Sequence, residues 1–193
     1  EAYIAGLETF VARGGDPKRV ASVASFFISR IDTAIDALIA ARLQSTTNAT
    51  EQSVLRSLAG KVAIANAKLA YQRYRELFGG RRWQVLAELG ARAQRLLWAS
   101  TSVKDPNYRD VVYVEELIGP DTVNTIPPAT FEAFRDHGRP CASLTEDVDA
   151  ARETMGRLAE VGISMQDATD RLLAEGVQLF SDAFEKLLKV VEK

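Results

Sequence analysis

The sequence predicts an α/β protein that is assembled from repeated βα units. Three short apolar segments, at 20–28, 95–100 and 122–126, have the composition of strands. Segments with the periodicity of amphipathic helices separate them, and this alternation is typical of a parallel sheet. Because a sheet of three parallel strands leaves both edges open, we expect the chain to form part of a larger barrel or sheet.

Length and composition are those of one ordinary folded domain. The 193 residues are 47% hydrophobic and 26% charged, with a net charge of −2, which leaves no basic surface for nucleic acid or an anionic membrane. The single cysteine, Cys141, excludes an internal disulfide. No signal peptide and no apolar run long enough to span a bilayer is found. We therefore expect a cytoplasmic protein.

The first helix is predicted over residues 1–13 and ends at the Gly-Gly-Asp-Pro turn of residues 14–17. Because nothing before the first residue caps this helix, we expect further residues upstream. The run at 20–28 is almost free of polar side chains, which is typical of a strand buried on both faces. Arg30 directly follows this strand. Ligands of parallel α/β proteins bind beyond the carboxyl ends of strands, although a core strand that ends in a solvated arginine gives the same pattern.

Only helical periodicity is found from residue 31 to residue 90. We expect a polar loop at 44–52, a long helix at 54–78 that bends at Gly60, and a short helix at 83–89. This length between two strands indicates a crossover that is enlarged by extra helices.

The second and third predicted strands lie close together in the sequence, at 95–100 and 122–126. The segment between them, 111–118, fits either a strand or a helix, and a helix suits a crossover better. The remaining predicted elements are helices at 130–135 and 145–161, and a long C-terminal helix that begins with a capping box at Ser164, is interrupted at Gly176 and ends at Val191.

Most of the other chemically suggestive residues have simpler structural interpretations. No glycine-rich phosphate loop is present. His137 and Cys141 lack the further ligands that a metal site needs. The adjacent acids Glu115 and Glu116 point apart on a helix, so we expect a solvated helix face rather than an acid/base pair.

Hydroxyl side chains and one cation follow both of the first two predicted strands. These residues are Ser25, Phe27, Ser29 and Arg30 at the end of the first strand, and Ser100, Thr101, Ser102 and Lys104 after the second. A guanidinium, an ammonium group and hydroxyl donors together are suited to holding a phosphate dianion. The two clusters therefore predict a substrate that carries a phosphate.

Four segments give the sequence a resemblance to a known family. They are SFFISRID at 25–32, GKVAIANAKLAYQ at 60–72, LWASTSVKDP at 97–106 and TVNTIPPAT at 122–130. In this order they resemble the later part of a transaldolase. The variant is the one with a long decorated crossover, which is related to the transaldolase part of fused transaldolase/phosphoglucose isomerase proteins.

The resemblance implies that the whole chain, 1–193, is the C-terminal segment of a single (β/α)₈ TIM-barrel domain, with the N-terminal strands outside this chain. Its three strands would be the sixth, seventh and eighth. Transaldolases transfer a dihydroxyacetone unit from a ketose phosphate to an aldose phosphate through a lysine Schiff base, without a cofactor. That lysine is expected upstream, so the isolated segment is expected to be inactive. Lys61 and Lys68 lie on a predicted helix and do not replace it.

The resemblance also implies five substrate-binding residues. Ser25 and Phe27 match positions that line the sugar site, Arg30 matches the phosphate-binding arginine, and Ser100 matches a serine beside the phosphate. Lys104 stands where much of the family has an arginine, and a lysine would contact the phosphate as a point charge without the bidentate fork. No metal ligand is implied.

The implied substrates are fructose 6-phosphate, sedoheptulose 7-phosphate, erythrose 4-phosphate and glyceraldehyde 3-phosphate of the pentose phosphate pathway. The implied protein partners are the N-terminal part of the same barrel and, in fused relatives, an isomerase domain. Two alternatives remain open from the residues alone. One is a helical interaction or scaffold module whose strand-like runs are buried helices, and the other is a sugar-phosphate binder without catalysis.

Overall fold

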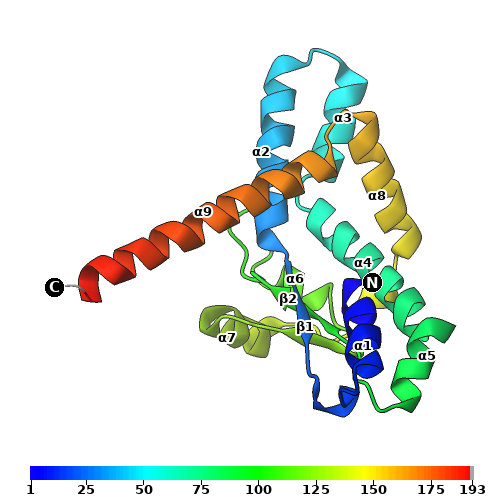
Figure 1. Cartoon of the computed structure of the whole chain (residues 1–193). Coiled ribbons are helices and arrows are strands. Elements are labelled where there is room, and N and C mark those ends of the chain that lie inside the picture. Colours follow the sequence, from blue (N-terminus) through cyan, green and yellow to red (C-terminus); the bar gives the residue numbers. More distant parts are fainter. Residues whose placement is uncertain (192–193) are drawn as a thin grey trace.

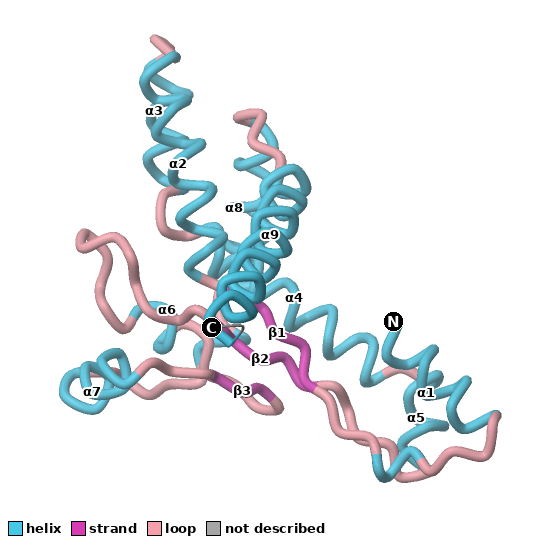
Figure 2. Tube along the Cα trace, turned by 60° about the vertical axis from the view of Figure 1, so that its left-hand side comes forward, coloured by secondary structure: helices cyan, strands magenta, loops and turns pink. Residues whose placement is uncertain are grey.

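The computed structural model describes residues 1–191 and contains one parallel sheet with helices packed beside it (Figure 1). Strands β1 (Val23–Phe27), β2 (Arg95–Ala99) and β3 (Thr122–Asn124) lie side by side in chain order, as Figure 2 shows. The predicted α/β class and parallel sheet are confirmed. A helical module in which these runs are buried helices is therefore wrong.

Helices make up most of the remaining chain. In chain order they are α1 (Ala2–Ala12), the 3₁₀ turn η1 (Pro17–Arg19), α2 (Ser29–Ser45), α3 (Ala49–Leu58), α4 (Val62–Gly79), α5 (Arg81–Glu88), α6 (Val112–Glu115), α7 (Pro128–His137), the 3₁₀ turn η2 (Ser143–Thr145), α8 (Val148–Glu160) and α9 (Met165–Val191).

The two faces of the sheet have different environments. Phe26 of β1 is paired in register with Trp98 of β2, and their rings pack edge to face with centroids 5.7 Å apart. Trp98 is buried, and its indole N–H donates a hydrogen bond of 3.1 Å to the carbonyl of Leu117. Successive residues of a strand point to opposite faces, so Ser25 and Phe27 lie on the other face, where Phe27 is 43% exposed.

All three strands are shorter than predicted, and β1 is not buried on both faces as expected. The segment predicted at 20–28 pairs only over Val23–Phe27, with alternating burial, because β1 has one neighbouring strand and its second face is uncovered within residues 1–191. The segment predicted at 95–100 ends one residue early, since Ser100 adopts a left-handed backbone with φ of 55°. The segment predicted at 122–126 pairs only to Asn124.

Helices α2, α3 and α4 of the crossover between β1 and β2 pack together with α8, which follows β3, and form one helical layer. The predicted polar loop at 44–52 is reduced to residues 46–48, because Asn48 caps α3 by accepting hydrogen bonds from the N–H groups of Thr50 and Glu51. The predicted long helix is divided at Gly60, whose φ of 70° ends one helix before α4 begins.

Two further predictions concern the aromatic residues and the C-terminal helix. The stripe of Tyr71, Tyr74 and Phe78 packs as predicted, with successive ring centroids 5.8 Å and 4.8 Å apart. The hydroxyl of Ser164 accepts the N–H of Asp167, which confirms the predicted cap of α9. The predicted interruption at Gly176 is wrong. Instead α9 continues away from the molecule (Figure 1), and all of its residues from 177 to 191 are exposed.

Candidate functional site

The candidate site lies where β1 and β2 end. The carboxyl ends of parallel strands meet at one edge of a sheet, and here the N–H of Ser29 donates a hydrogen bond of 3.0 Å to the carbonyl of Ser100. Helix α2 begins at Ser29, so Arg30 lies in its first turn. The structure therefore places the two predicted clusters next to each other along the backbone.

A hollow of about 620 Å³, which we call the cation hollow, is formed by α2, the loop after β2, and α9. Its lining includes three cationic residues, Arg30, Lys104 and Arg171, and one acidic residue, Glu175. Arg171 donates a hydrogen bond of 2.7 Å to Glu175, but both side chains are more than half exposed, so this ion pair is weak and exchangeable. The hollow therefore has a net positive lining, which favours an anionic ligand.

Phe27 orients the guanidinium of Arg30. The central carbon of the guanidinium lies 4.9 Å from the centroid of the Phe27 ring, a distance at which a cation–π interaction contributes about 0.5–1 kcal/mol at an exposed site. Because Phe27 is fixed by β1, this contact limits the positions that the arginine can occupy.

A second hollow, of about 530 Å³, lies along the free edge of β1, and we call it the edge hollow. Ser25, Phe27 and Arg30 line it on the strand side. Its opposite wall is a set of apolar side chains of α9: Leu172, Leu173, Val177 and Phe180.

The five predicted residues are thus brought together in part. Ser25, Phe27 and Arg30 share the edge hollow, and Arg30 and Lys104 share the cation hollow. Ser100 contacts this region through its backbone carbonyl, and it is not among the residues that line either hollow. The Lys104 ammonium donates a hydrogen bond of 2.8 Å to the hydroxyl of Ser102. The binding roles of all five residues stay predictions.

Two residues of this region were missed as site residues. Arg171 is 141 positions after Arg30 and carries no local signal beyond its place on an amphipathic helix. Ser29 was recognised as part of the first cluster but given no role. It is 1% exposed, and its hydroxyl has no hydrogen-bond partner among the described residues, although it lines the cation hollow.

Behind the site, α2 carries a buried carboxylate, Asp32. It accepts hydrogen bonds of 2.8 Å from the N–H of Ala63 and from the hydroxyl of Tyr113. Burial raises the pKa of Asp32 to about 6, although both hydrogen bonds oppose this rise by stabilising the ionised form. Asp32 joins three segments that are distant in the sequence.

Glu115 and Glu116 point apart as predicted, but both form ion pairs, and only Glu116, at 43%, has a substantially exposed side chain. Arg109 forms an ion pair of 2.9 Å with Glu115 and holds the pKa of that carboxyl below its usual range. Glu116 forms an ion pair of 2.9 Å with Lys68, whose side chain is 5% exposed. Both acids therefore hold α6 against neighbouring segments.

The single histidine also has a structural partner. His137 forms a hydrogen bond of 2.9 Å with Asp110, and this carboxylate raises the pKa of His137. Cys141 is a free, exposed thiol. Within residues 1–191, no group of three or more His, Cys, Asp or Glu side chains is arranged to hold a metal ion.

Neither lysine of the decorated crossover lies at a strand end. Lys61 immediately precedes α4, and Lys68 lies within it, where it is 4% exposed and paired with Glu116. Separately, no helix within the described residues is long and apolar enough to cross a membrane.

Comparison with known proteins identifies the family of this chain. The family model described as Transaldolase/Fructose-6-phosphate aldolase matches residues 2–191. The chain therefore belongs to the transaldolase/fructose-6-phosphate aldolase family, as the resemblance predicted. Its three parallel strands and helices are consistent with part of the TIM barrel of that family.

Individual relatives match along nearly the whole chain. The chain is 46% identical to the transaldolase of Trichodesmium erythraeum (strain IMS101), covering 100% of this chain and 51% of the relative. It is 50% identical to transaldolase 2 of Nostoc punctiforme, covering 99% and 51%, and 47% identical to the transaldolase of Thermobifida fusca, covering 97% and 49%. The chain spans about half the length of the curated relatives it matches.

Proposed function

We propose that this chain supplies the last three βα units of a transaldolase barrel. The enzyme transfers a dihydroxyacetone unit from a ketose phosphate to an aldose phosphate through a Schiff base on a lysine outside this chain. The observation that carries the proposal is the cation hollow, which joins Arg30 and Lys104 at the carboxyl end of the sheet. Active sites of (β/α)₈ barrels lie at this end.

The proposed roles follow from the chemistry of each side chain. Arg30, held by Phe27, binds the substrate phosphate through its planar fork, and Lys104 adds a second positive charge. The family resemblance implies that Ser25 faces the sugar and that Ser100 lies beside the phosphate. The covalent step and the proton transfers belong to residues outside this chain, so the segment alone is expected to be inactive.

The proposed partner within the enzyme is the remaining part of the barrel. Its presence would pair the free edges of β1 and β3, which a complete parallel barrel does not leave open. A fused isomerase domain, the four sugar phosphates named above, the pentose phosphate pathway and a cytoplasmic location follow from the family resemblance and stay predictions.

Non-covalent sugar-phosphate binding is the second candidate function. This function needs no Schiff-base lysine. It is favoured because neither Lys61, which precedes α4, nor Lys68, which lies within α4, is at a strand end. The two functions are separated by treating the full-length polypeptide that contains this chain with fructose 6-phosphate and borohydride. A transaldolase gives a stable covalent adduct by intact mass, whereas a non-covalent binder gives none.

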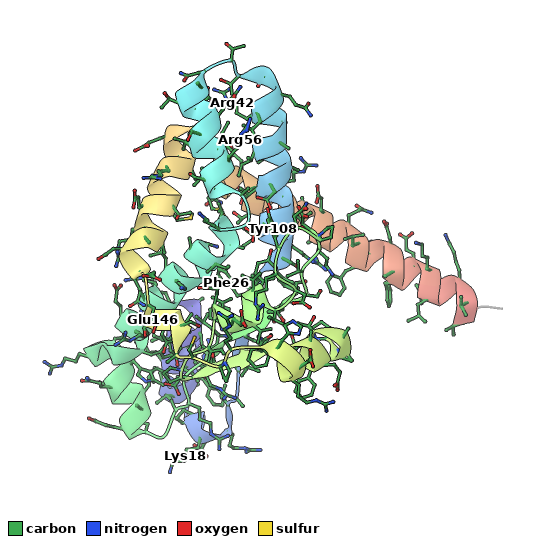
Figure 3. The ribbon with its side chains drawn as sticks, turned by 180° about the vertical axis from the view of Figure 1, so that it is seen from behind. Lys18, Phe26, Arg42, Arg56, Tyr108 and Glu146 are labelled. Carbon is green, nitrogen blue, oxygen red and sulfur yellow. The ribbon has the colours of Figure 1, made fainter. Side chains whose placement is uncertain are left out.

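The phosphate role is tested with Arg30→Ala in the same polypeptide. Loss of a charge-assisted contact of about 1.5–3 kcal/mol corresponds to roughly a 10- to 150-fold rise in KM for fructose 6-phosphate. Borohydride trapping at saturating sugar should persist. Arg56→Ala is the matched control, because Arg56 lies on α3, far above the sheet in the view of Figure 3. An unchanged KM in Arg30→Ala would contradict the proposed phosphate site.

A further inference from the structure

We propose that Tyr108 is a positioning residue for Lys104. By its hydrogen bond to Asp36, it fixes the loop that presents the lysine to the substrate phosphate. This inference rests on the proposed function, because it concerns the second cation of the same site. Tyr108 itself lies outside the cation hollow, so it acts only through Lys104.

The two hydrogen bonds that Asp36 accepts, which we call the anchor, join three segments that are far apart in the sequence. The hydroxyl of Tyr108 donates a hydrogen bond of 2.8 Å to one carboxylate oxygen of Asp36, on α2. The other oxygen of Asp36 accepts the N–H of Gly60, at the junction of α3 and α4, at 3.1 Å. Figure 3 shows Tyr108, on the loop that follows β2, beside α2.

The ring of Tyr108 is held as closely as its hydroxyl. It packs directly over Gly60, where an added Cβ would lie 2.7 Å from the ring carbon Cζ. Only glycine allows this approach, and its φ of 70° favours glycine for a second reason. The tyrosine therefore has one well-defined position against the helical layer.

A short turn connects Tyr108 to Lys104. The N–H of Tyr108 donates to the carbonyl of Asp105 at 3.1 Å, and the side chain of Asp105 accepts the N–H of Asn107 at 2.9 Å. These hydrogen bonds hold residues 105–108 in a closed turn directly after Lys104. Fixing Tyr108 consequently fixes the backbone from which the lysine side chain extends.

Lys104 lies between the anchor and the cation hollow. It lines a hollow of about 380 Å³ together with Asp32, Asp36 and Tyr108, and it also lines the cation hollow together with Arg30. Tyr108 thus holds the loop whose lysine reaches the cation hollow.

The test compares two matched variants in the full-length enzyme, Tyr108→Phe and Tyr113→Phe. Each removes one hydroxyl that donates a hydrogen bond of 2.8 Å to a carboxylate of α2. Tyr113, however, lies on α6 and not on the loop. For Tyr108→Phe we expect KM for fructose 6-phosphate and Ki for inorganic phosphate to rise roughly 3- to 10-fold, with kcat within about twofold. Tyr113→Phe should leave KM and Ki unchanged and lower only the stability.

Two further measurements identify the route through Lys104. In a Lys104→Ala background, Tyr108→Phe should have no additional effect on Ki for inorganic phosphate, because the group that it positions is gone. Amide hydrogen exchange over residues 101–107 should be faster in Tyr108→Phe only. Equal effects of the two tyrosine variants on Ki, or additive effects of Tyr108→Phe and Lys104→Ala, would overturn the positioning role.

The experiment separates this inference from the proposed function. If the wild-type enzyme gives a borohydride adduct but Tyr108→Phe binds inorganic phosphate as the wild type does, the positioning role is wrong and the transaldolase function stands. If no adduct forms, but calorimetry shows that Tyr108→Phe weakens inorganic phosphate binding, the positioning role stands and the covalent function is wrong.

Discussion

The helical layer behind the sheet and the outer part of α9 differ in how completely their side chains are buried and hydrogen-bonded. In the helical layer, Asp32 is 1% exposed and has two hydrogen-bond donors, and Leu55 and Val62 are fully buried. In the outer part of α9, residues 177–191, every residue is exposed, including Phe180 at 80%. The side chains of the first region are covered within this chain, whereas the second region presents an apolar stripe that no element of residues 1–191 covers.

The spacing of that stripe indicates a packing face and not a random set of exposed residues. Leu173, Val177, Phe180, Phe184 and Leu187 recur every three or four residues along α9 and are each more than half exposed. The uncovered face of the sheet, at Phe27, lies in the same hollow as the start of the stripe. The apolar side chains of this chain are therefore buried where its own helices pack together, and they remain exposed where the rest of a barrel is expected.

The largest predicted effect is a loss of stability at the buried Trp98. Trp98→Ala should destabilise the 193-residue chain by about 3–5 kcal/mol, because it removes a buried ring that packs against Phe26. Phe180→Ala should change the same chain by less than about 0.5 kcal/mol. Urea unfolding followed by circular dichroism measures both.

The same two variants are expected to behave differently in the full-length protein. There Phe180→Ala is expected to cost about 2–4 kcal/mol, since the remaining barrel would cover the ring. Equal small effects in the chain and in the full-length enzyme would show that α9 stays solvated and has no packing role.

The second prediction concerns pH and the buried carboxylate. Burial raises the pKa of Asp32 from 3.8 to about 6, so between these values the folded chain binds more protons than the unfolded chain. Stability contributed by this group is therefore present below about pH 4 and is lost as the pH rises through 6, by about 3 kcal/mol. Asp32→Asn should remove this part of the fall in stability.

Urea unfolding at pH 4, 5, 6 and 7 measures this difference. Asp182→Asn, in the exposed part of α9, is the matched control and should keep the wild-type profile. A wild-type profile in Asp32→Asn would mean that Asp32 does not titrate in this range in the folded chain.

The third prediction is a smaller loss of stability at Gly60. Gly60→Ala places a methyl group 2.7 Å from the Tyr108 ring and forces a non-glycine residue to a φ of 70°. We expect a loss of about 1–3 kcal/mol in urea unfolding, together with faster amide exchange over residues 101–107. Gly156→Ala, inside α8 with no atom within 4 Å of the added methyl, should not show either effect.

The smallest predicted effect is a gain of stability in α9. Gly176 lies inside the helix, and a methyl group added there would meet nothing within 4 Å. Gly176→Ala should therefore stabilise the 193-residue chain by about 0.5–1 kcal/mol, as expected for glycine in a helix interior. A thermal melt measures the gain, and a lower melting temperature would mean that α9 bends at this position in solution.

The positions of the elements could be predicted from local patterns, but their ends could not. Apolar runs and helical stripes correctly located three strands and the helices between them. The strand predicted at 20–28 was too long because sequence alone does not show that Ile28 precedes the first turn of α2. The interruption predicted at Gly176 was wrong because the flanking residues of α9 favour a continuous helix despite the cost of one glycine.

The candidate site could be predicted only for side chains that lie near a strand end. Arg30 and Lys104 were found because each follows an apolar run, and the structure places them on one hollow. Arg171 was missed because it reaches that hollow from a helix with no such signal. Tyr108 was missed because its partner, Asp36, is 72 residues away in the sequence.

By itself, the sequence determined the α/β class and the order of the strands along the chain, because both depend on composition and periodicity over a few neighbouring residues. The family was indicated by the resemblance of four short segments. The tertiary structure alone decided which charges are paired, as for Lys68 with Glu116, 48 residues apart, and which apolar surfaces remain open. These outcomes depend on contacts between distant segments, whose free energy is gained only when the segments are packed together.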